Sequence, residues 1–386
     1  MNVLSLFDGM SCGQIALREL GIKVDKYFAS EIDRHAIMQT QLNFPDTVQL
    51  GDVRKITVKD LPRIDLLIGG SPCQGFSFAG KQLNFNDPRS ALFFEFVRIW
   101  HEVKAINPNA RFMLENVRMD KRFENIISEY LGIRPVRINS SLVSAQERVR
   151  LYWSDIRIRK EGLFGDVHTD IPLPEDRGIL LVDILQPENE VAVKYHITKR
   201  STIERIKRRL DCNSSFAPRI NPPKSDTLTV GNNSSKMSLT TGTTLITPQI
   251  YQRPHGGNKG GFFCGKTPTL TSNSWHQNNL LVSGRRVIQL NGSKESNGRQ
   301  PFQQNRVYSV GGISPALCSA HAGSAPAVLL DGYIRRLTPT ECARLQTIPS
   351  WYKWGCSETQ QYKMLGNGWT VEVIKHILSY LTTIIS

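Results

Sequence analysis

The stretch Gly69-Gly70-Ser71-Pro72-Cys73-Gln74-Gly75-Phe76-Ser77 places a cysteine beside a proline at the head of a glycine-containing loop. The residues before it, Asp65-Leu66-Leu67-Ile68, are an apolar run that predicts a buried strand ending at the two glycines. Open α/β sheets bind ligands beyond the carboxyl ends of their strands, so Cys73 is predicted to lie where a ligand would bind. A catalytic cysteine reacts as the thiolate and needs a partly exposed, electropositive setting. Because free cysteine is usually buried, an inert core position is the alternative, and the surrounding motifs decide between the two.

Three earlier strand ends are typical of a nucleotide-binding α/β unit. Val3–Phe7 is an apolar run followed by Asp8-Gly9-Met10-Ser11-Cys12-Gly13 and a helical pattern. Strand, glycine turn and helix open such units, because glycine lets the backbone approach a ligand at a helix amino terminus. The next strand, Lys26–Ser30, ends in Glu31, where an acid typically accepts hydrogen bonds from ribose, and Asp52 follows a third strand as a candidate partner for an adenine amino group. Each acid alone could be a solvated loop residue, but together the three strand ends favour an adenosine-type cofactor.

Further ionisable residues are predicted at the same sheet edge. A strand that begins at Arg111 ends in Glu115, and Arg148 and Arg150 alternate with Val149 as the chain enters a later strand. Residues two apart lie on one face of a strand, so both guanidinium groups are expected on the same face. An ordinary solvated edge is the alternative for this pair. The segment 71–90 is long for a connection in an α/β fold, which is typical of a functional lid.

Composition excludes several classes of protein. With 386 residues, 40% of them hydrophobic, the chain is expected to form one large and one smaller domain. Its apolar runs fall far short of the roughly 18 residues that a membrane span needs, and its amino terminus lacks the basic leader of a signal peptide. Seven cysteines, an odd number without a close Cys-x-x-Cys pair, argue against a disulfide framework and against a zinc site, and no metal is expected. We therefore expect a cytoplasmic protein in a reducing compartment.

Positive charge is concentrated in the middle of the chain. Residues 213–330 carry eleven Lys or Arg against two acids, which is +9 of the net charge of +14. This asymmetry indicates a polyanionic partner, most simply nucleic acid, although a merely soluble basic surface is the alternative. A basic helix is predicted from a capping box at Ser201. After it, the segment is rich in Gly, Ser, Thr and Asn, with a weak repeat at 226–229, 268–271 and 315–318. The repeat predicts a small, loop-rich β domain, and low-complexity disorder is the other interpretation.

The order of motifs resembles the DNA (cytosine-5)-methyltransferase family of bacteria and phages, and also the catalytic domain of the animal de novo enzymes. The resemblance covers residues 1–155 and 333–386, and no single motif is as specific as the whole order. The matching pieces are Leu6-Phe7-Asp8-Gly9, Glu31, Gly51-Asp52-Val53, Gly70-Ser71-Pro72-Cys73-Gln74, Glu115-Asn116-Val117, Gln146-Glu147-Arg148-Val149-Arg150, Arg335-Arg336-Leu337-Thr338-Pro339-Thr340-Glu341-Cys342-Ala343-Arg344-Leu345-Gln346 and Gly366-Asn367.

The resemblance implies a role for each matched residue. Cys73 would be the nucleophile that attacks C6 of cytosine, and Glu115 would engage N3 and the exocyclic amine. Arg150 would donate to the cytosine O2, with Arg148 supporting the loop and Glu115. The cofactor would be S-adenosyl-L-methionine. The residues implied to bind it are Phe7, Asp8, Gly9, Glu31, Asp52, Val53, Pro72, Leu92 and Asn367.

The resemblance also implies a fold and a partner. A Rossmann-like sheet of the class I S-adenosylmethionine-dependent methyltransferases, with helices on both faces, would be formed by 1–155 and completed by 333–386. Residues 156–332 would form a smaller, loop-rich β domain that recognises the target sequence. The substrate would be double-stranded DNA with the target cytosine flipped out, acted on by a monomer without an obligate protein partner.

Two departures from the family pattern stand in this sequence. Many relatives follow the last Gly-Asn with a small residue and Val-Pro, whereas this chain has Gly368-Trp369-Thr370, and the first glycine loop carries Met10-Ser11-Cys12. Neither departure is expected to touch the catalytic residues. Two other functions stay open: a tRNA cytosine methyltransferase of the same fold, which usually has a compact middle region, and an inactive DNA-binding regulator. The presence of Cys73, Glu115 and Arg150 argues against the regulator.

Overall fold

The computed structural model describes residues 1–72, 91–162, 165–196 and 333–381, together with short strands between residues 249 and 330. The chain divides into two compact units. The first comprises 1–177, 316–323 and 339–386, and the second comprises 178–315 and 324–338. The predicted boundaries at 155 and 333 differ from these divisions, which fall at 177 and 338, and the recognition role of 156–332 stays a prediction.

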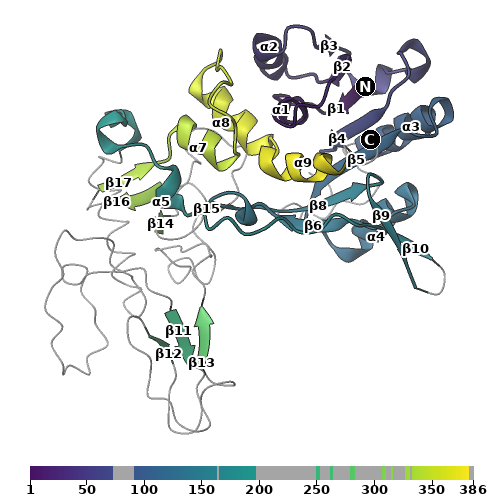
Figure 1. Ribbon diagram of the computed structural model, residues 1–386. Helices are drawn as coiled ribbons and strands as arrows, with labels where there is room; N and C mark the ends of the chain where they lie inside the picture. The colour runs from purple at the N-terminus through teal and green to yellow at the C-terminus, as the bar shows by residue number, and fades with distance from the viewer. Residues whose placement is uncertain are drawn as a thin grey trace, which may run out of the picture. The chain divides into compact units, whose positions relative to one another are not determined.

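The first unit is organised around a seven-stranded sheet with the order β3-β2-β1-β4-β5-β8-β6. Five strands, from β3 to β5, run parallel, and β8 lies antiparallel to both of its neighbours (Figure 1). The strands are β1 (Asn2–Leu6), β2 (Lys26–Ser30), β3 (Val48–Gln49), β4 (Leu66–Gly70), β5 (Arg111–Val117), β6 (Val136–Asn139) and β8 (Val149–Ser154). The predicted α/β class with a mostly parallel sheet is therefore confirmed.

Helices cover both faces of this sheet, because the strands are apolar on both sides. On one face Leu4, Leu67 and Phe112 form a core with residues of two helices, among them Trp100 and Phe123. On the other face α1 packs against Ile68 and also contacts α9. The helices of this unit are α1 (Cys12–Glu19), α2 (Arg34–Asn43), α3 (Ala91–Ile106), α4 (Lys121–Leu131), α7 (Pro339–Leu345), α8 (Glu358–Asn367) and α9 (Val371–Leu378).

The carboxy-terminal helices belong to the same unit as the first strand, although more than 300 residues separate them in sequence. The Tyr352 hydroxyl donates to the Met10 carbonyl oxygen at 2.9 Å. Gln39 and Asn43 on α2 form hydrogen bonds with the backbone at Lys353 and Gly355. The segment between α7 and α8 therefore packs against α2 and the loop that follows β1. A short strand β7 (Gln146–Glu147) and a hairpin of β9 (Ile158–Glu161) and β10 (Asp166–Thr169) complete the unit.

The second unit contains a short helix and several short strands. Its buried Arg335 forms an ion pair with Glu188, with Nε 3.0 Å from Oε2, and Glu188 also binds His196 at 2.7 Å. Three antiparallel strands lie in the order β12-β11-β13, and β16 pairs with β14 and β17. The elements are α5 (Leu181–Ile184), β11 (Gln249–Gln252), β12 (Gly261–Phe263), β13 (Asn279–Val282), β14 (Val307–Ser309), β15 (Ser314–Pro315), β16 (Ala327–Leu330) and β17 (Tyr333–Arg336). The basic helix predicted at Ser201 and the repeats at 226–229 and 268–271 lie outside the described residues.

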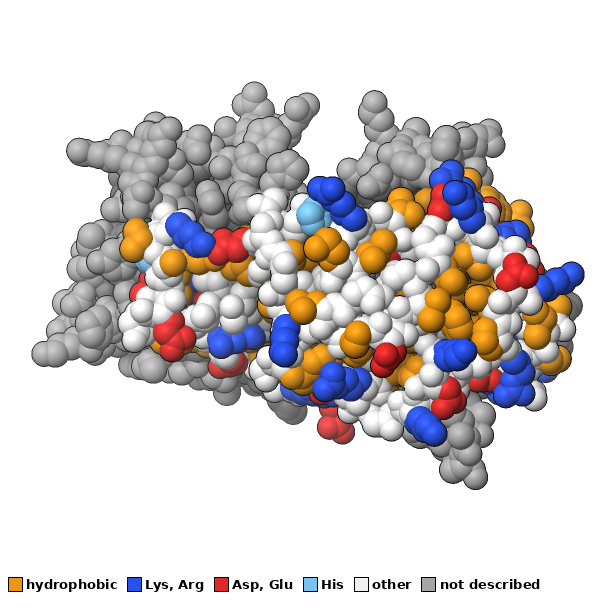
Figure 2. Space-filling view, turned by 90° about the horizontal axis from the view of Figure 1, so that it is seen from above, with side chains coloured by type: hydrophobic (Ala, Val, Ile, Leu, Met, Phe, Trp, Pro, Cys, Tyr) orange, Lys and Arg blue, Asp and Glu red, His pale blue; other side chains and the backbone are white. Residues whose placement is uncertain are grey.

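The described surface carries both signs of charge. Figure 2 shows Lys and Arg side chains interspersed with Asp and Glu side chains. Ion pairs such as Lys363–Asp33 at 2.6 Å and Arg63–Asp65 at 3.0 Å contribute to this balance. Within the part of the chain that the structure describes, every helix is too short or too polar to span a bilayer.

Candidate active site

The predicted site residues that the structure describes gather at one edge of the sheet. The loop after β1 carries Phe7, Asp8 and Gly9, and Glu31 follows β2. Ser71 and Pro72 follow β4, while Glu115 lies near the end of β5, where Gly70 is its neighbour in the sheet register. Since β1, β2, β4 and β5 are adjacent and parallel, their carboxyl ends form one continuous edge.

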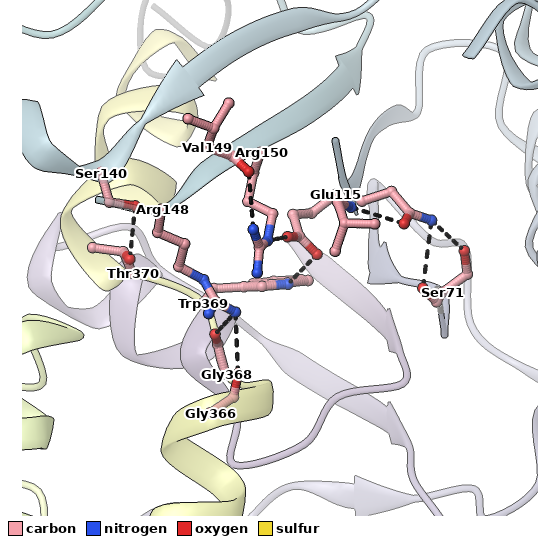
Figure 3. A network of polar contacts seen from close by, with 12 residues as sticks. Ser71, Glu115, Ser140, Arg148, Val149, Arg150, Gly366, Gly368, Trp369 and Thr370 are labelled. Carbon is pink, nitrogen blue, oxygen red and sulfur yellow. Dashed lines mark hydrogen bonds and ion pairs between the residues drawn. The ribbon is translucent and has the colours of Figure 1, made fainter. Parts of the chain in front are cut away.

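Glu115 and Arg150 form a buried ion pair on this edge. Arg150 Nε lies 3.0 Å from Glu115 Oε1, with 16% of the arginine side chain and 11% of the glutamate side chain exposed. The sheet register explains the contact: Val117 lies opposite Arg150, two residues from Glu115, so both side chains emerge on the same face. Arg150 Nη1 also donates to the Val149 carbonyl oxygen at 2.9 Å, which limits its motion (Figure 3). Shielding from water makes such a charge-assisted pair stronger than an exposed one.

Trp369 completes the surroundings of this carboxylate. Its indole Nε1 donates to Glu115 Oε2 at 3.2 Å, so Trp369 and Arg150 bind different oxygens of the same carboxylate (Figure 3). The expectation that the Gly368-Trp369-Thr370 departure leaves the catalytic residues untouched is therefore wrong. The contact joins residues 254 positions apart, and it arises because the turn between α8 and α9 packs over the ends of β4 and β5.

Arg148 supports the turn that carries Trp369. Only 4% of this residue is exposed, and its Nη2 donates to the carbonyl oxygens of Gly366 at 3.3 Å and Gly368 at 2.9 Å. Helix ends leave carbonyl groups without partners in the helix, and a guanidinium group can bind several of them. Through this turn, Arg148 is linked to Glu115 by way of Trp369.

Two further buried residues stabilise this region, and the sequence prediction gave neither of them a role. The side chain of Gln346 donates to the carbonyl oxygens of Leu365 at 2.6 Å and Gly368 at 3.2 Å. Asn116 Nδ2 donates to Ser71 Oγ at 3.1 Å and thereby fixes the chain just before the cysteine loop. Both residues stand inside the quoted motifs, and the position of Asn116 directly after Glu115 was a signal for its role, whereas Gln346 has no charged site residue beside it in the sequence.

Cys73 and the rest of the segment 73–90 lie outside the described residues. The predicted lid and the nucleophile therefore stay predictions, supported by their described flank. Ser71 is 4% exposed, and it is fixed by Asn116 directly beside Glu115 in the sequence.

The loop after β1 has an irregular backbone. Phe7, Gly9 and Ser11 have φ angles of 58°, 59° and 61°, a region that only glycine adopts without strain. The Gly9 N–H donates to Glu31 Oε2 at 2.8 Å, and Glu31 Oε1 accepts from the N–H groups of the two residues that follow it. Glu31 is thus fixed against the glycine loop, and its ribose-binding role stays a prediction. A methyl group at Gly9 would meet no atom within 4 Å, so space for a ligand lies beside this carboxylate.

Asp8 points away from that space. It is buried and accepts hydrogen bonds from the hydroxyls of Ser11 and Tyr27, the latter at 2.8 Å. Burial raises the pKa of Asp8 to about 6, against the opposing effect of these hydrogen bonds. The side chain of Asp8 therefore holds the loop in shape, and its backbone is bound as well, because its N–H donates to the Ser30 carbonyl oxygen at 3.1 Å and its carbonyl oxygen accepts from the Ser11 N–H at 3.0 Å. The predicted cofactor contact of Asp8 stays a prediction.

The remaining predicted cofactor residues occupy mixed positions. Asp52 accepts hydrogen bonds from the Arg54 side chain, which together with the Arg54 N–H lower the pKa of Asp52 to about 2. Val53 is buried, and Leu92 is partly buried against the core on α3. Asn367 is the exposed last residue of α8, two residues before Trp369.

The strand order and the glycine loop after β1 define the fold of a class I methyltransferase. The profile of the family described as C-5 cytosine-specific DNA methylase matches residues 1–131 and 139–383. The chain therefore belongs to the C-5 cytosine-specific DNA methylases, which are enzymes that methylate C5 of cytosine in DNA. The predicted family and activity are confirmed.

Similar proteins come from phages and bacteria. The chain is 31% identical over 441 aligned residues to the orphan methyltransferase M.SPRI of Bacillus phage SPR, covering 99% of this chain and 97% of that protein. It is 27% identical to the type II methyltransferase M.HgiCI of Herpetosiphon aurantiacus, covering 96% and 94% of the two chains. Among solved structures, the S. pombe Dnmt2 methyltransferase has a TM-score of 0.59 at 16% identity, covering 100% and 99% of the two chains. At that identity the likeness concerns the fold alone.

Proposed function

We propose that this enzyme methylates C5 of a flipped-out cytosine in a specific sequence of double-stranded DNA, through a covalent bond between Cys73 Sγ and the C6 atom. The observation that carries the proposal is the Glu115 carboxylate, held by Arg150 at 3.0 Å beside the strand end that leads to Cys73. Target atoms inside a duplex are out of reach, so the base leaves the stack at a cost of about a few kcal/mol.

The proposed reaction has three stages: addition to C6, methyl transfer to C5 and elimination. The Cys73 thiolate adds to C6, the C5–C6 π electrons form a C4–C5 double bond, and the C4–N3 π electrons move to N3, which takes a proton from the protonated form of Glu115. Arg150 would donate to the O2 atom of the cytosine, which offsets charge as the thiolate adds. When C5 accepts a methyl group, the C4–N3 double bond re-forms. A base then removes the C5 proton, the electrons of that C–H bond re-form the C5–C6 double bond, and the C6–S bond breaks in the same step to release the thiolate. The N3 proton returns to Glu115.

The proposed methyl donor is S-adenosyl-L-methionine, whose sulfonium carries an electrophilic methyl group. The donor set at the edge of the sheet fits it, because Glu31 presents a carboxylate beside the open backbone of Gly9. Phe7 in the loop and Asp52 after β3 would flank the nucleoside. Arg54 occupies the Asp52 carboxylate in the structure, so adenine recognition by Asp52 would require this ion pair to rearrange or to share an oxygen.

Target choice is assigned to residues 156–332, where most of the net positive charge lies. Exchanging this segment for that of a relative should move the methylated sequence, and an active chimera with unchanged specificity would argue against the assignment. Bisulfite sequencing of a methyl-free plasmid exposed to the enzyme reads out the target. The relatives named above come from phages and bacteria, so we place the enzyme in the cytoplasm of a prokaryotic or phage-infected cell. A monomer without an obligate protein partner is our proposal for its assembly.

The covalent bond is tested with duplex DNA that carries 5-fluorocytosine at the target, because fluorine at C5 cannot leave as a proton does. The native protein with cofactor should form an adduct that survives denaturation. Cys73→Ala should form none, whereas Cys356→Ala, which removes a partly exposed free thiol elsewhere, should react like the native protein. An adduct that persists in Cys73→Ala would overturn the proposal, and a tRNA substrate labelled in place of DNA would favour the other family function.

A further inference from the structure

We propose that Trp369 is a positioning residue for methyl transfer: its indole N–H fixes the oxygen of the Glu115 carboxylate that Arg150 Nε does not bind. This inference rests on the proposed role of Glu115. Nε1 lies 3.2 Å from Oε2, which is within the range of an N–H···O hydrogen bond. Trp369 is only 8% exposed, so the bond is shielded from water. An indole N–H can donate a hydrogen bond but cannot accept one, so Trp369 restrains Glu115 without accepting a proton when Glu115 is protonated.

Two donors on two oxygens determine the orientation of the carboxylate plane. With Arg150 alone, Glu115 could still rotate about its last side-chain bond, a torsion that is intrinsically broad. With Nε of Arg150 on Oε1 and Nε1 of Trp369 on Oε2, that rotation is blocked. A group that must meet N3 and the exocyclic amine of a base at the same time gains from such a fixed plane.

The indole itself is held on several sides. A methyl group at Gly70 would lie 2.9 Å from Trp369 Nε1 and 3.0 Å from Glu115 Oε2, so only glycine leaves room for this hydrogen bond. A methyl group at Gly13 on α1 would lie 3.4 Å from the far edge of the ring. The residues on either side of Trp369 are held as well. Arg148 donates to the Gly368 carbonyl oxygen at 2.9 Å, and the Thr370 hydroxyl donates to Gln346 Oε1 at 2.9 Å. A side chain so enclosed has one orientation, as a positioning role requires.

The first test replaces Trp369 with Phe, which keeps an aromatic ring and removes the N–H. Single-turnover transfer of a tritiated methyl group from S-adenosyl-L-methionine to duplex DNA is expected to slow about 10- to 100-fold, the usual effect of losing a hydrogen bond to a charged group. Because the role lies in orientation, the dissociation constants for DNA and cofactor should stay within about two-fold. The matched control is Trp351→Phe, since the Trp351 indole N–H also donates to a glutamate, Glu19, at 2.7 Å, but on the surface.

A second variant excludes a fault of packing. Replacing Trp369 with β-(3-benzothienyl)alanine preserves the shape of the indole and substitutes sulfur for the N–H, so it should show the same slow transfer as Trp369→Phe. Native rates in the benzothienyl variant, or equal losses in Trp351→Phe, would overturn the inference. Adduct formation by the native protein on 5-fluorocytosine DNA is measured in parallel. If that adduct fails, the proposed function is at fault, whereas an intact adduct with unaffected Trp369 variants refutes the positioning role alone.

Discussion

Gly70→Ala is the most direct perturbation of the site that leaves every polar group in place. The added methyl carbon would lie 2.9 Å from Trp369 Nε1, 3.0 Å from Glu115 Oε2 and 3.3 Å from Trp369 Cε2. Favourable contacts of this kind begin at about 3.5 Å, so the indole and the carboxylate must separate from the new methyl by roughly half an ångström. The backbone at Gly70 has no positive φ angle, so the effect is one of space and not of backbone strain.

The size of the effect follows from the two ways of making room. Compressing a packed site costs about 1–3 kcal/mol, and breaking the hydrogen bond to the carboxylate costs about 1.5–3 kcal/mol. Breaking the bond also removes a restraint on Glu115. We therefore expect Gly70→Ala to unfold at a lower temperature than the native protein and to transfer methyl groups about 10- to 100-fold more slowly in a single turnover.

Gly355→Ala is the control for this experiment. Its methyl group would lie 2.8 Å from Cδ2 of Leu42, but Leu42 is 48% exposed and can swing into solvent. This variant should keep both its stability and its rate. The interpretation of the site fails if Gly70→Ala methylates at the native rate, or if Gly355→Ala loses as much.

Three further changes test the supports of the site. Burial raises the pKa of Asp8 from 3.8 to about 6, so the folded state favours the protonated acid, and the stabilisation from this proton is lost as the pH rises through 6. Asp8→Asn cannot ionise, so its stability relative to the native protein should rise by about 3 kcal/mol between pH 4 and pH 8. A stability difference that does not change with pH would argue against the raised pKa of Asp8. Glu31→Ala should weaken cofactor binding, measured by calorimetry, more than DNA binding, and the opposite order would reject its ribose role. Arg148→Lys should lower the unfolding temperature, because one ammonium group replaces the forked guanidinium that binds Gly366 and Gly368, and an unchanged melting curve would contradict that role.

Local patterns in the sequence predicted most of the framework. The strand Lys26–Ser30 is β2 to the residue, and the strand expected to begin at Arg111 is β5, which ends at Val117, two residues after Glu115. Both predictions succeed because apolar residues recur in these segments and glycine, proline or charged residues end them. The strand expected near Arg148 and Arg150 is β8, which begins at Val149, so Arg150 lies in the strand and Arg148 precedes it.

The contacts of Trp369 could not be predicted in this way. Its partner Glu115 is 254 residues away, and a periodic pattern carries no information about which side chain of a distant turn reaches a strand end. The inward direction of the Asp8 side chain was hidden for a similar reason, because Tyr27 and Ser11 bind it only after β1 and β2 have paired. Sequence patterns located the edge of the sheet, whereas the arrangement of donors around the carboxylate depended on packing between distant segments.

The two departures from the family pattern meet in the structure and fit each other. A methyl group at Gly368 would lie 3.2 Å from Cys12 Sγ and 3.7 Å from Met10 Sδ, so the larger residues in the first glycine loop fill space that a glycine at 368 leaves open. The Cys12 thiol is buried, and it hydrogen-bonds the backbone at Trp369. A methyl group at residue 368 would also lie 3.0 Å from the Met364 carbonyl oxygen, so a larger residue there would push the turn away from the first glycine loop. Because the same turn carries the indole that binds Glu115, the fit between Gly368 and Cys12 helps to keep Trp369 within hydrogen-bonding distance of the carboxylate.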